Sequence, residues 1–396
     1  MARAVLYLPD AAERRLAALP VAGRPLAVRA IVAAARTGAE RVGVPAALRT
    51  PALEAALRRI QGLAGRVRWL DGRDPAESRA FACEPCLLVP ASALIEARTL
   101  ASLLASPMEV GGAAIVESAE SGAPVLLAPP ELVTRLWALL AAGAGLGAAL
   151  MRHVEETRPK LRPAGGLFVR VTAEADRRDA EAALYASLGT DDDTAVDRLI
   201  HRRCSRPITR VLVQTRATPN QVSAASLLIG LGAASGFCQG TPLAAVLGLG
   251  LYSLAVVLDH VDGELARLTF QETRFGAALD WTIDTVVLSL VVLAMGLSAG
   301  RGPGAVAMGF LGALGVTLSA LVARYLPRKI AVGETIGGAL KSMGNRDLFY
   351  LLLLTFVLLT WALPAALPIL VLIIALGSQA YWIACVAKIR RHAALL

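Results

Sequence analysis

Four aspartates stand inside two segments of this 396-residue chain that are otherwise apolar enough to be membrane helices. A charged side chain near hydrocarbon is costly, so such residues mark functional sites in membrane proteins. Residues three or four apart share one face of a helix. Asp259 and Asp262 therefore share a face of the first segment, and Asp280 and Asp284 share a face of the second. If the two segments pair as an antiparallel hairpin, the four carboxylates converge near one membrane face.

Four carboxylates so close together repel one another, so positive charge must lie among them. Arg267 supplies one charge and cannot balance four. Oxygen ligands suit hard cations such as Mg²⁺, Mn²⁺ or Ca²⁺. Two divalent ions would neutralise the cluster, and a pair ~3.5–4 Å apart is a common arrangement for phosphoryl transfer. Two other interpretations stay open here, namely a proton or ion relay in a transporter and a set of paired structural acids.

The two segments carry eight residues in the pattern D-x2-D-G-x2-A-R-x8-G-x3-D-x3-D. These residues are Asp259, Asp262, Gly263, Ala266, Arg267, Gly276, Asp280 and Asp284. The pattern resembles the signature of the CDP-alcohol phosphotransferase family, and every fixed position of that signature is present. The resemblance covers roughly Arg202 to Arg391. It implies a membrane transferase that moves a phospho-alcohol group from a CDP-linked donor to an alcohol acceptor and releases CMP.

The resemblance also implies a role for each signature residue. The metal ligands would be Asp259, Asp262, Asp280 and Asp284, holding two Mg²⁺ or Mn²⁺ ions. Asp284 would also act as the general base on the acceptor hydroxyl. The run Ser205–Val222 resembles the start of the first span in that family, with Pro219-Asn220 at the boundary. The cytidine and its diphosphate are expected at Asp262, Gly263, Ala266, Arg267, Gly276 and Asn220.

The C-terminal half is predicted to be an all-α domain of six transmembrane helices. The spans are Pro219–Phe237, Pro242–Leu265, Phe275–Ser298, Gly304–Leu326, Asp347–Leu363 and Leu367–Lys388. Basic residues flank them almost entirely on one side, and the other side has only Arg301. The positive-inside rule therefore places both termini and the acid cluster in the cytoplasm.

A basic segment precedes the first span. Thr190 or Asp191 is the predicted cap of a helix that runs to about Val213. Its arginines are Arg198, Arg202, Arg203, Arg206 and Arg210. A basic amphipathic helix in this place is predicted to lie on an anionic membrane surface. A plain linker helix is the alternative. The sequence thus divides into residues 1–189, a juxtamembrane segment 190–218, and the membrane domain 219–396.

The N-terminal part alternates short apolar runs with helical stretches such as Pro25–Arg36 and Pro51–Gly62. The predicted buried strands are Ala4–Leu8, Arg41–Val44, Val67–Leu70, Cys86–Val89, Ala113–Val116, Val125–Leu127 and Leu167–Val171. Alternation of this kind is typical of an α/β domain with a largely parallel, Rossmann-type sheet. Leu136–Met151 is apolar but too short for a span of ~20 residues. It is predicted to be a buried or interfacial helix.

Leu19–Val44 is similar to the segment that follows the nucleotide-binding loop in sugar-phosphate nucleotidyltransferases, and Leu167–Leu188 to their closing strand and helix. The chain departs from that family at the positions expected to bind the nucleotide phosphates and the metal ion. The loop Leu8–Glu13 has no glycine, Pro90-Ala91-Ser92 stands where a metal-binding aspartate is expected, and Phe168–Thr172 lacks a carboxylate. The domain is therefore predicted to be inactive in nucleotidyl transfer, with a structural or regulatory role.

The fusion of these two domains resembles the bifunctional enzymes that make CDP-inositol and then di-myo-inositol phosphate phosphate. Gly344-Asn345-Arg346-Asp347 also fits that subgroup. CDP-inositol and CDP-diacylglycerol are both expected donors. A phosphorylated acceptor would need fixed positive groups, for which the candidates are Lys341, Arg346, Arg324 and Arg328. An ion-coupled transporter and an inactive membrane scaffold are the alternatives from other classes.

Composition supports a membrane protein. The chain is 56% hydrophobic, with mean hydropathy +0.58 and a net charge of +9. Because the basic residues cluster at the ends of apolar segments, a membrane surface explains the charge and nucleic acid is not expected. Cys83 and Cys86 form one CxxC without a second pair, so free thiols are expected and no zinc site. No cleaved signal is expected. The expected state is a homodimer in a bacterial or archaeal cell membrane.

Overall fold

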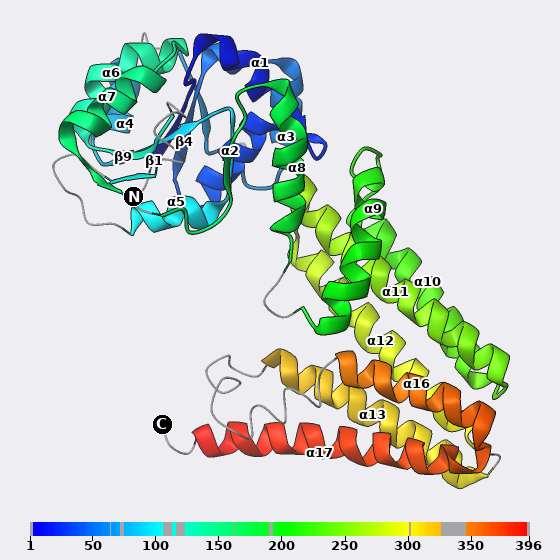
Figure 1. The fold of residues 1–396 in the computed structure, drawn as a ribbon. Helices are drawn as coiled ribbons and strands as arrows, with labels where there is room; N and C mark the ends of the chain where they lie inside the picture. The colour runs from blue at the N-terminus through cyan, green and yellow to red at the C-terminus, as the bar shows by residue number, and fades with distance from the viewer. Residues whose placement is uncertain are drawn as a thin grey trace. The chain divides into compact units, whose positions relative to one another are not determined.

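The structure is a computed structural model that describes residues 3–63, 65–71, 75–105, 113–115, 123–161, 163–189, 193–300, 302–325 and 346–393. The chain divides into two compact units (Figure 1). The first consists of Met1–Leu188 together with Leu268–Gln271. The second consists of Gly189–Arg267 and Glu272–Leu396.

The first unit is built on a seven-stranded sheet of order β10-β8-β9-β6-β1-β4-β5. The strands are β1 (Arg3–Tyr7), β4 (Arg41–Pro45), β5 (Val67–Leu70), β6 (Cys86–Pro90), β8 (Ala113–Ile115), β9 (Val125–Ala128) and β10 (Lys160–Leu161). Strands β6, β1, β4 and β5 are parallel neighbours, and β9 runs antiparallel to β6 and β8. The predicted α/β class is confirmed. Two small pairs complete the strands, namely β2 (Pro20–Val21) with β3 (Arg24–Pro25), and β7 (Ala93–Ile95) with β11 (Phe168–Arg170).

Helices cover both faces of this sheet. Successive side chains of its central strands point to opposite faces, and they are apolar on both. Ala4 and Leu6 of β1 join a core with α2 (Leu26–Arg36), α3 (Pro51–Arg58) and α5 (Ala97–Leu104). Val5 and Tyr7 join a second core with α4 (Pro75–Ala82), α6 (Pro130–Ala142) and α7 (Gly147–Thr157). All four of these β1 residues are fully buried. The short α1 (Arg14–Ala17) and the later α8 (Arg177–Ala186) complete the helices of this unit.

Much of Leu136–Met151 is buried, as predicted, but the segment forms two helices instead of one. Helix α6 ends at Ala142 and α7 starts at Gly147, because Gly143 takes the left-handed conformation (φ 65°) that stops a helix. A Cβ at Gly143 would lie 2.9 Å from the Cβ of Ala47, so the turn also packs tightly. Leu140, Leu146 and Leu150 are buried in the second core, which explains the apolar run without a membrane.

The second unit is helical. Its long helices are α10 (Pro219–Cys238), α11 (Pro242–Thr269), α12 (Arg274–Ser298), α13 (Pro303–Tyr325), α16 (Arg346–Ala362) and α17 (Leu367–Ala393). All six lie where spans are predicted. Among the described residues, five helices are long and apolar enough to cross a membrane, and α16, with 17 residues, is not one of them. The prediction of six spans is therefore supported for five.

Glycines let the helices of the second unit approach closely. A Cβ at Gly236 of α10 would lie 2.9 Å from the Ala244 carbonyl oxygen and 2.9 Å from Gly248 Cα, both on α11. A Cβ at Gly309 of α13 would lie 3.0 Å from Gly296 Cα on α12. Close packing through small residues is the usual way in which helices associate in lipid, because there the hydrophobic effect does not drive them together.

The juxtamembrane helix differs from its prediction. Thr190 and Asp191 lie outside the described residues, and the helical segment that follows is capped by Thr194. The Asp197 backbone nitrogen donates to Thr194 Oγ1 (3.2 Å), and the Thr194 backbone nitrogen donates to Asp197 Oδ2 (3.0 Å). A π-helical turn (Asp197–His201) then leads into α9 (Arg202–Leu212).

The buried side of this helix is polar. Its buried residues are Asp197, His201, Arg202, Ser205 and Thr209. Its exposed side includes Leu199 (60% exposed), Ile200 (54%) and Val211 (64%). The outward face therefore carries apolar residues and the other arginines, as a lipid-facing helix would. Arg202, in contrast, is buried.

Candidate functional site

Helices α11 and α12 bring the four signature aspartates together. Carboxylate oxygens of Asp259, Asp262 and Asp280 all lie within 4.8 Å of one another. Asp284 joins them through Arg346, whose Nη2 lies 3.3 Å from Asp284 Oδ2 and 3.4 Å from Asp259 Oδ2. Thr273 fixes the start of α12 by accepting from the Gly276 backbone nitrogen (2.9 Å), which sets the register of Asp280 and Asp284.

These residues fit a divalent cation. Three carboxylates from two helices offer hard oxygen ligands within 4.8 Å, which is the donor set that Mg²⁺ and Mn²⁺ prefer. Ser223 of α10 donates its hydroxyl to Asp262 Oδ2 and so orients that carboxylate from outside the cluster. Arg346 is a cation at the cluster, but one charge does not balance four acids.

Two small surfaces flank the aspartates. On α11, Arg267 Nη1 lies 3.5 Å from where a Cβ of Gly263 would be, and the buried Arg267 Nε has no hydrogen-bond partner among the described residues. On the other side, Asn220 Oδ1 lies 3.5 Å from where a Cβ of Gly276 would be. Ala266 is half-buried on α11. Of the residues predicted to hold the nucleotide, the structure thus pairs Gly263 with Arg267 and Gly276 with Asn220.

The residues predicted to bind an acceptor phosphate fall into two groups. Arg346 lies at the aspartate cluster, and Arg324 at the end of α13 lies over the Trp281 ring, 4.5 Å from its centroid. Lys341 and Arg328 lie outside the described residues, as do Gly344 and Asn345.

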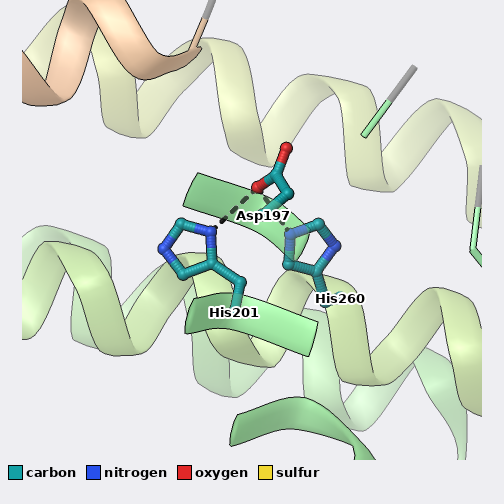
Figure 2. Close-up of side chains that lie close together, drawn as sticks. All are labelled: Asp197, His201 and His260. Carbon is teal, nitrogen blue, oxygen red and sulfur yellow. Dashed lines mark hydrogen bonds and ion pairs between the residues drawn. The ribbon is translucent and has the colours of Figure 1, made fainter. Parts of the chain in front are cut away.

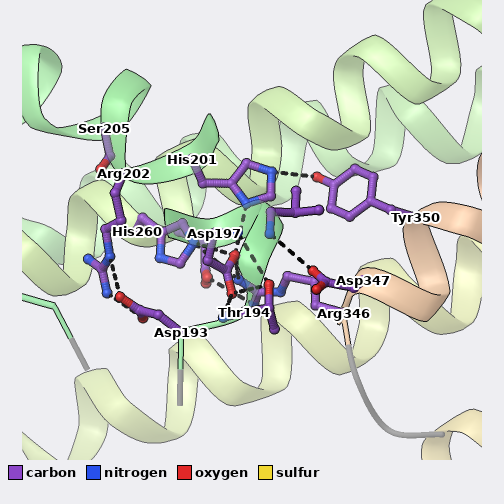
Figure 3. A network of polar contacts seen from close by, with 12 residues as sticks. Asp193, Thr194, Asp197, His201, Arg202, Ser205, His260, Arg346, Asp347 and Tyr350 are labelled. Carbon is purple, nitrogen blue, oxygen red and sulfur yellow. Dashed lines mark hydrogen bonds and ion pairs between the residues drawn. The ribbon is translucent and has the colours of Figure 1, made fainter. Parts of the chain in front are cut away.

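The sequence reasoning missed a buried network beside the cluster. Asp197 lies between the imidazoles of His201 and His260 (Figure 2). His201 also bonds the Tyr350 hydroxyl, and Arg346 reaches the same carboxylate (Figure 3). Burial would raise the pKa of Asp197, but the hydrogen bonds from both imidazoles hold that pKa well below its usual range. The only sequence signal was a histidine, His260, directly after the first signature aspartate.

A second missed residue, Glu264, lies within the signature itself. It is fully buried and accepts from Arg202 Nη1 (2.9 Å), Ser205 Oγ (2.9 Å) and Thr209 Oγ1 (2.6 Å). Arg202 also bonds Asp193, and these hydrogen bonds raise the pKa of Arg202 although burial lowers it. Because three donors of the juxtamembrane segment meet one carboxylate of α11, Glu264 fixes α9 against the helix that carries Asp259 and Asp262.

Comparison with known proteins identifies this half of the chain. Residues 216–389 match the family model described as CDP-alcohol phosphatidyltransferase. They form a CDP-alcohol phosphatidyltransferase domain. The predicted family is therefore confirmed for this domain, which contains all eight signature residues.

Curated relatives of the chain carry two kinds of name. A protein of Thermococcus kodakarensis, named bifunctional IPC transferase and DIPP synthase, is 31% identical over 116 residues, which are 29% of this chain and 26% of the relative. A protein of the same name from Rubrobacter xylanophilus is 36% identical over 140 residues, 35% of this chain and 31% of the relative. The third is from Cereibacter sphaeroides and is named CDP-diacylglycerol–glycerol-3-phosphate 3-phosphatidyltransferase. It is 42% identical over 78 residues, 19% of this chain and 35% of the relative. The chain thus spans about a quarter to a third of the length of these relatives.

The contact of Ser223 with Asp262 gives a prediction about metal binding. Ser223→Ala should weaken Mn²⁺ binding about 10–100-fold, the usual effect of removing a hydrogen bond that orients a metal ligand. The dissociation constant can be measured by titration of the purified protein followed by electron paramagnetic resonance. Ser226→Ala is the matched control, because Ser226 lies one turn further along α10, is equally buried, and donates to the Ala255 carbonyl instead. Equal Mn²⁺ affinity in the two variants would contradict the assignment.

Proposed function

We propose that the protein is an integral-membrane transferase that moves a phospho-alcohol group from a CDP-linked donor to an alcohol acceptor, with CMP as the leaving group. The observation that carries the proposal is the gathering of the signature aspartates within a domain of the CDP-alcohol phosphatidyltransferase family. An inactive scaffold would not need all four carboxylates at one place, because each is costly near hydrocarbon.

The residues suggest how the reaction proceeds. Two Mg²⁺ or Mn²⁺ ions held by Asp259, Asp262, Asp280 and Asp284 would reduce the negative charge of the donor diphosphate. Arg267, with its unpaired Nε, and the Gly276–Asn220 surface would hold the cytidine diphosphate. The acceptor oxygen forms a bond to the distal phosphorus, and the bond from that phosphorus to CMP breaks.

Asp284 is the proposed general base. Its side chain is 48% exposed, against 15% for Asp259, so an acceptor hydroxyl reaches it more readily. The proton of that hydroxyl passes to the Asp284 carboxylate as the new oxygen–phosphorus bond forms. Arg346 contacts both carboxylates and supplies positive charge on this side of the cluster.

We propose that the acceptor carries a phosphate group of its own. Such an acceptor is repelled by four carboxylates, so it needs fixed cations in addition to metal ions, and arginine binds phosphate through two hydrogen bonds. Arg346 and Arg324 are the candidates that the structure describes. The name of one relative fits this chemistry, since it includes glycerol 3-phosphate, a phosphorylated alcohol. CDP-diacylglycerol and CDP-inositol are the proposed donors.

We propose that the first unit does not transfer nucleotides. At the adjacent carboxyl ends of β1 and β6, where a nucleotide would bind in such a fold, side chains already pair with one another. Ser92 donates to Glu13, and Arg170 forms an ion pair with the same carboxylate. Glu13 and Ser92 are buried. An acid already held by a hydroxyl and a guanidinium is a poor metal ligand, so the proposed role is structural or regulatory.

The first prediction from the proposed function tests the transfer reaction itself. Membranes containing the protein should release CMP from CDP-diacylglycerol or CDP-inositol only when a suitable acceptor and Mg²⁺ or Mn²⁺ are added. Asp284→Asn should lower the rate by ~10²–10⁴-fold, the usual size of a general-base effect. Asp179→Asn, at an exposed position of α8, is the control and should keep the wild-type rate. Ion flux without CMP release, or an Asp284→Asn variant of normal rate, would contradict the proposal.

A separate prediction concerns the first unit. The full chain, incubated with CTP and a sugar or inositol phosphate, should release no pyrophosphate above the background of empty membranes. The physical reason is the Glu13–Arg170 ion pair at the strand ends. Pyrophosphate formation that disappears in a Glu13→Gln variant would show that this unit is catalytic.

The last prediction of this group concerns orientation. Basic residues lie at alternate ends of successive helices. Arg216 and Arg274 lie at the N-terminal ends of α10 and α12, and Arg267 and Arg324 lie at the C-terminal ends of α11 and α13. By the positive-inside rule we propose that both termini and the aspartate cluster are cytoplasmic. Reporters fused before Ala2 and after Leu396 should both give cytoplasmic signals. A periplasmic signal from either fusion would reject this topology.

A further inference from the structure

The network beside the aspartate cluster joins three parts of the second unit. Asp197 and His201 belong to the turn before α9, His260 follows Asp259 on α11, and Tyr350 lies on α16. Asp197, His201 and His260 are buried, with side chains 6%, 1% and 9% exposed. Buried polar groups are costly unless they are hydrogen-bonded, so a set of this kind has a purpose in the site.

Both oxygens of the Asp197 carboxylate accept hydrogen bonds from neighbouring groups (Figure 3). Oδ1 accepts from His201 Nδ1 (2.8 Å) and His260 Nε2 (2.9 Å), and Oδ2 accepts from the backbone and hydroxyl of Thr194 (both 3.0 Å). With Nδ1 of His201 as the donor, its Nε2 accepts from the Tyr350 hydroxyl (2.9 Å). The capping contact and the imidazoles thus hold Asp197 in one orientation.

A metal ion is one use for such a set, since one ligand atom from each of the three residues lies within 4.8 Å of the others. Arg346 argues against it. Arg346 Nη1 lies 3.4 Å from Asp197 Oδ1 and 3.3 Å from His260 Nε2. A guanidinium is always charged in proteins, so a metal ion at these atoms would face a fixed positive charge. The arrangement is better explained as a support for Arg346.

Arg346 connects the network to the aspartates through its two terminal nitrogens. Nη1 faces Asp197, while Nη2 faces Asp259 and Asp284. A guanidinium is a rigid plane, so a carboxylate that fixes one nitrogen also fixes the direction of the other. The next residue, Asp347, accepts from the backbone nitrogens of Ala195 and Val196, which holds the start of α16 against the same turn.

We propose that Asp197, His201 and His260 are positioning residues that hold the Arg346 guanidinium in place to receive the phosphate of a phosphorylated acceptor. This inference rests on the proposed function. Without Asp197, the carboxylates nearest to Arg346 are those of Asp259 and Asp284, and the guanidinium moves toward them. It then presents its nitrogens poorly to an acceptor and competes with cations for the cluster.

The test is a comparison of Michaelis constants with glycerol 3-phosphate and inositol phosphate as the acceptor probes. Asp197→Asn and His201→Ala should raise KM for the phosphorylated acceptor about tenfold or more, as expected when a charged hydrogen bond is lost. At saturating Mg²⁺ or Mn²⁺, KM for the CDP-linked donor should change less than about twofold. His201→Asn retains a donor near the Nδ1 position and should recover most of the loss. A purely structural defect would raise both constants together and would not be recovered.

A double-variant comparison identifies Arg346 as the residue through which the network acts. In an Arg346→Ala background, Asp197→Asn should have no further effect on the acceptor KM. Asp197→Asn alone should also weaken Mn²⁺ binding, and adding Arg346→Ala should remove that effect. Additive effects on the acceptor KM would overturn the proposal.

Two further outcomes keep this inference separate from the proposed function. If the wild-type protein releases no CMP with any donor and acceptor, the proposed function fails before any variant is compared. If zinc or another transition metal copurifies with the wild type and is lost in His201→Ala, the network is a metal centre and the positioning proposal is overturned. Elemental analysis of the purified protein decides that point. His201→Ala, compared with His201→Asn, tests the proposal where Asp197→Asn fails to fold.

Discussion

Repulsion among four carboxylates between apolar helices is the constraint on which the second unit depends. Water cannot disperse their charge there, so the protein must supply positive charge or bind it. Arg346 supplies one charge and contacts two of the four acids directly. The remaining negative charge suits the divalent cations that are proposed to bind there.

The same constraint explains why the juxtamembrane helix has a polar interior. Asp197 and Glu264 bring further negative charge close to the cluster, and each is matched by its own donors, namely two imidazoles in one case and Arg202 with two hydroxyls in the other. Breaking a buried pair of this kind leaves an uncompensated charge, which typically costs ~3–5 kcal/mol. The helix therefore buries polar residues and exposes apolar residues together with its other arginines, unlike an amphipathic helix on a soluble protein.

In the first unit, the apolar packing of the sheet and the polar contacts at its strand ends are separate features. Its sheet is held by apolar, largely parallel strands and by helices packed on both faces. The residues at the carboxyl ends of β1 and β6 include the buried polar side chains of Ser92 and Glu13. Glu13, Ser92 and Arg170 now satisfy one another there. An internal ion pair in this place holds the strand ends together and leaves no free carboxylate among these three residues.

The sequence by itself determined the elements whose signals are local. Apolar runs bounded by turns gave the strands of the sheet, long apolar segments gave the helices of the second unit, and fixed spacing gave the four aspartates and their family. The break at Gly143 was missed because a glycine in a helical pattern does not reveal the sign of its φ angle. Only the tertiary structure decided that Asp197, His201 and His260 meet. Asp197 and His260 are 63 residues apart, and Arg346 is 149 residues from Asp197. No sequence periodicity connects residues so far apart, because their contact depends on how separate helices pack. The local sequence around each residue does not indicate which distant residue it will contact.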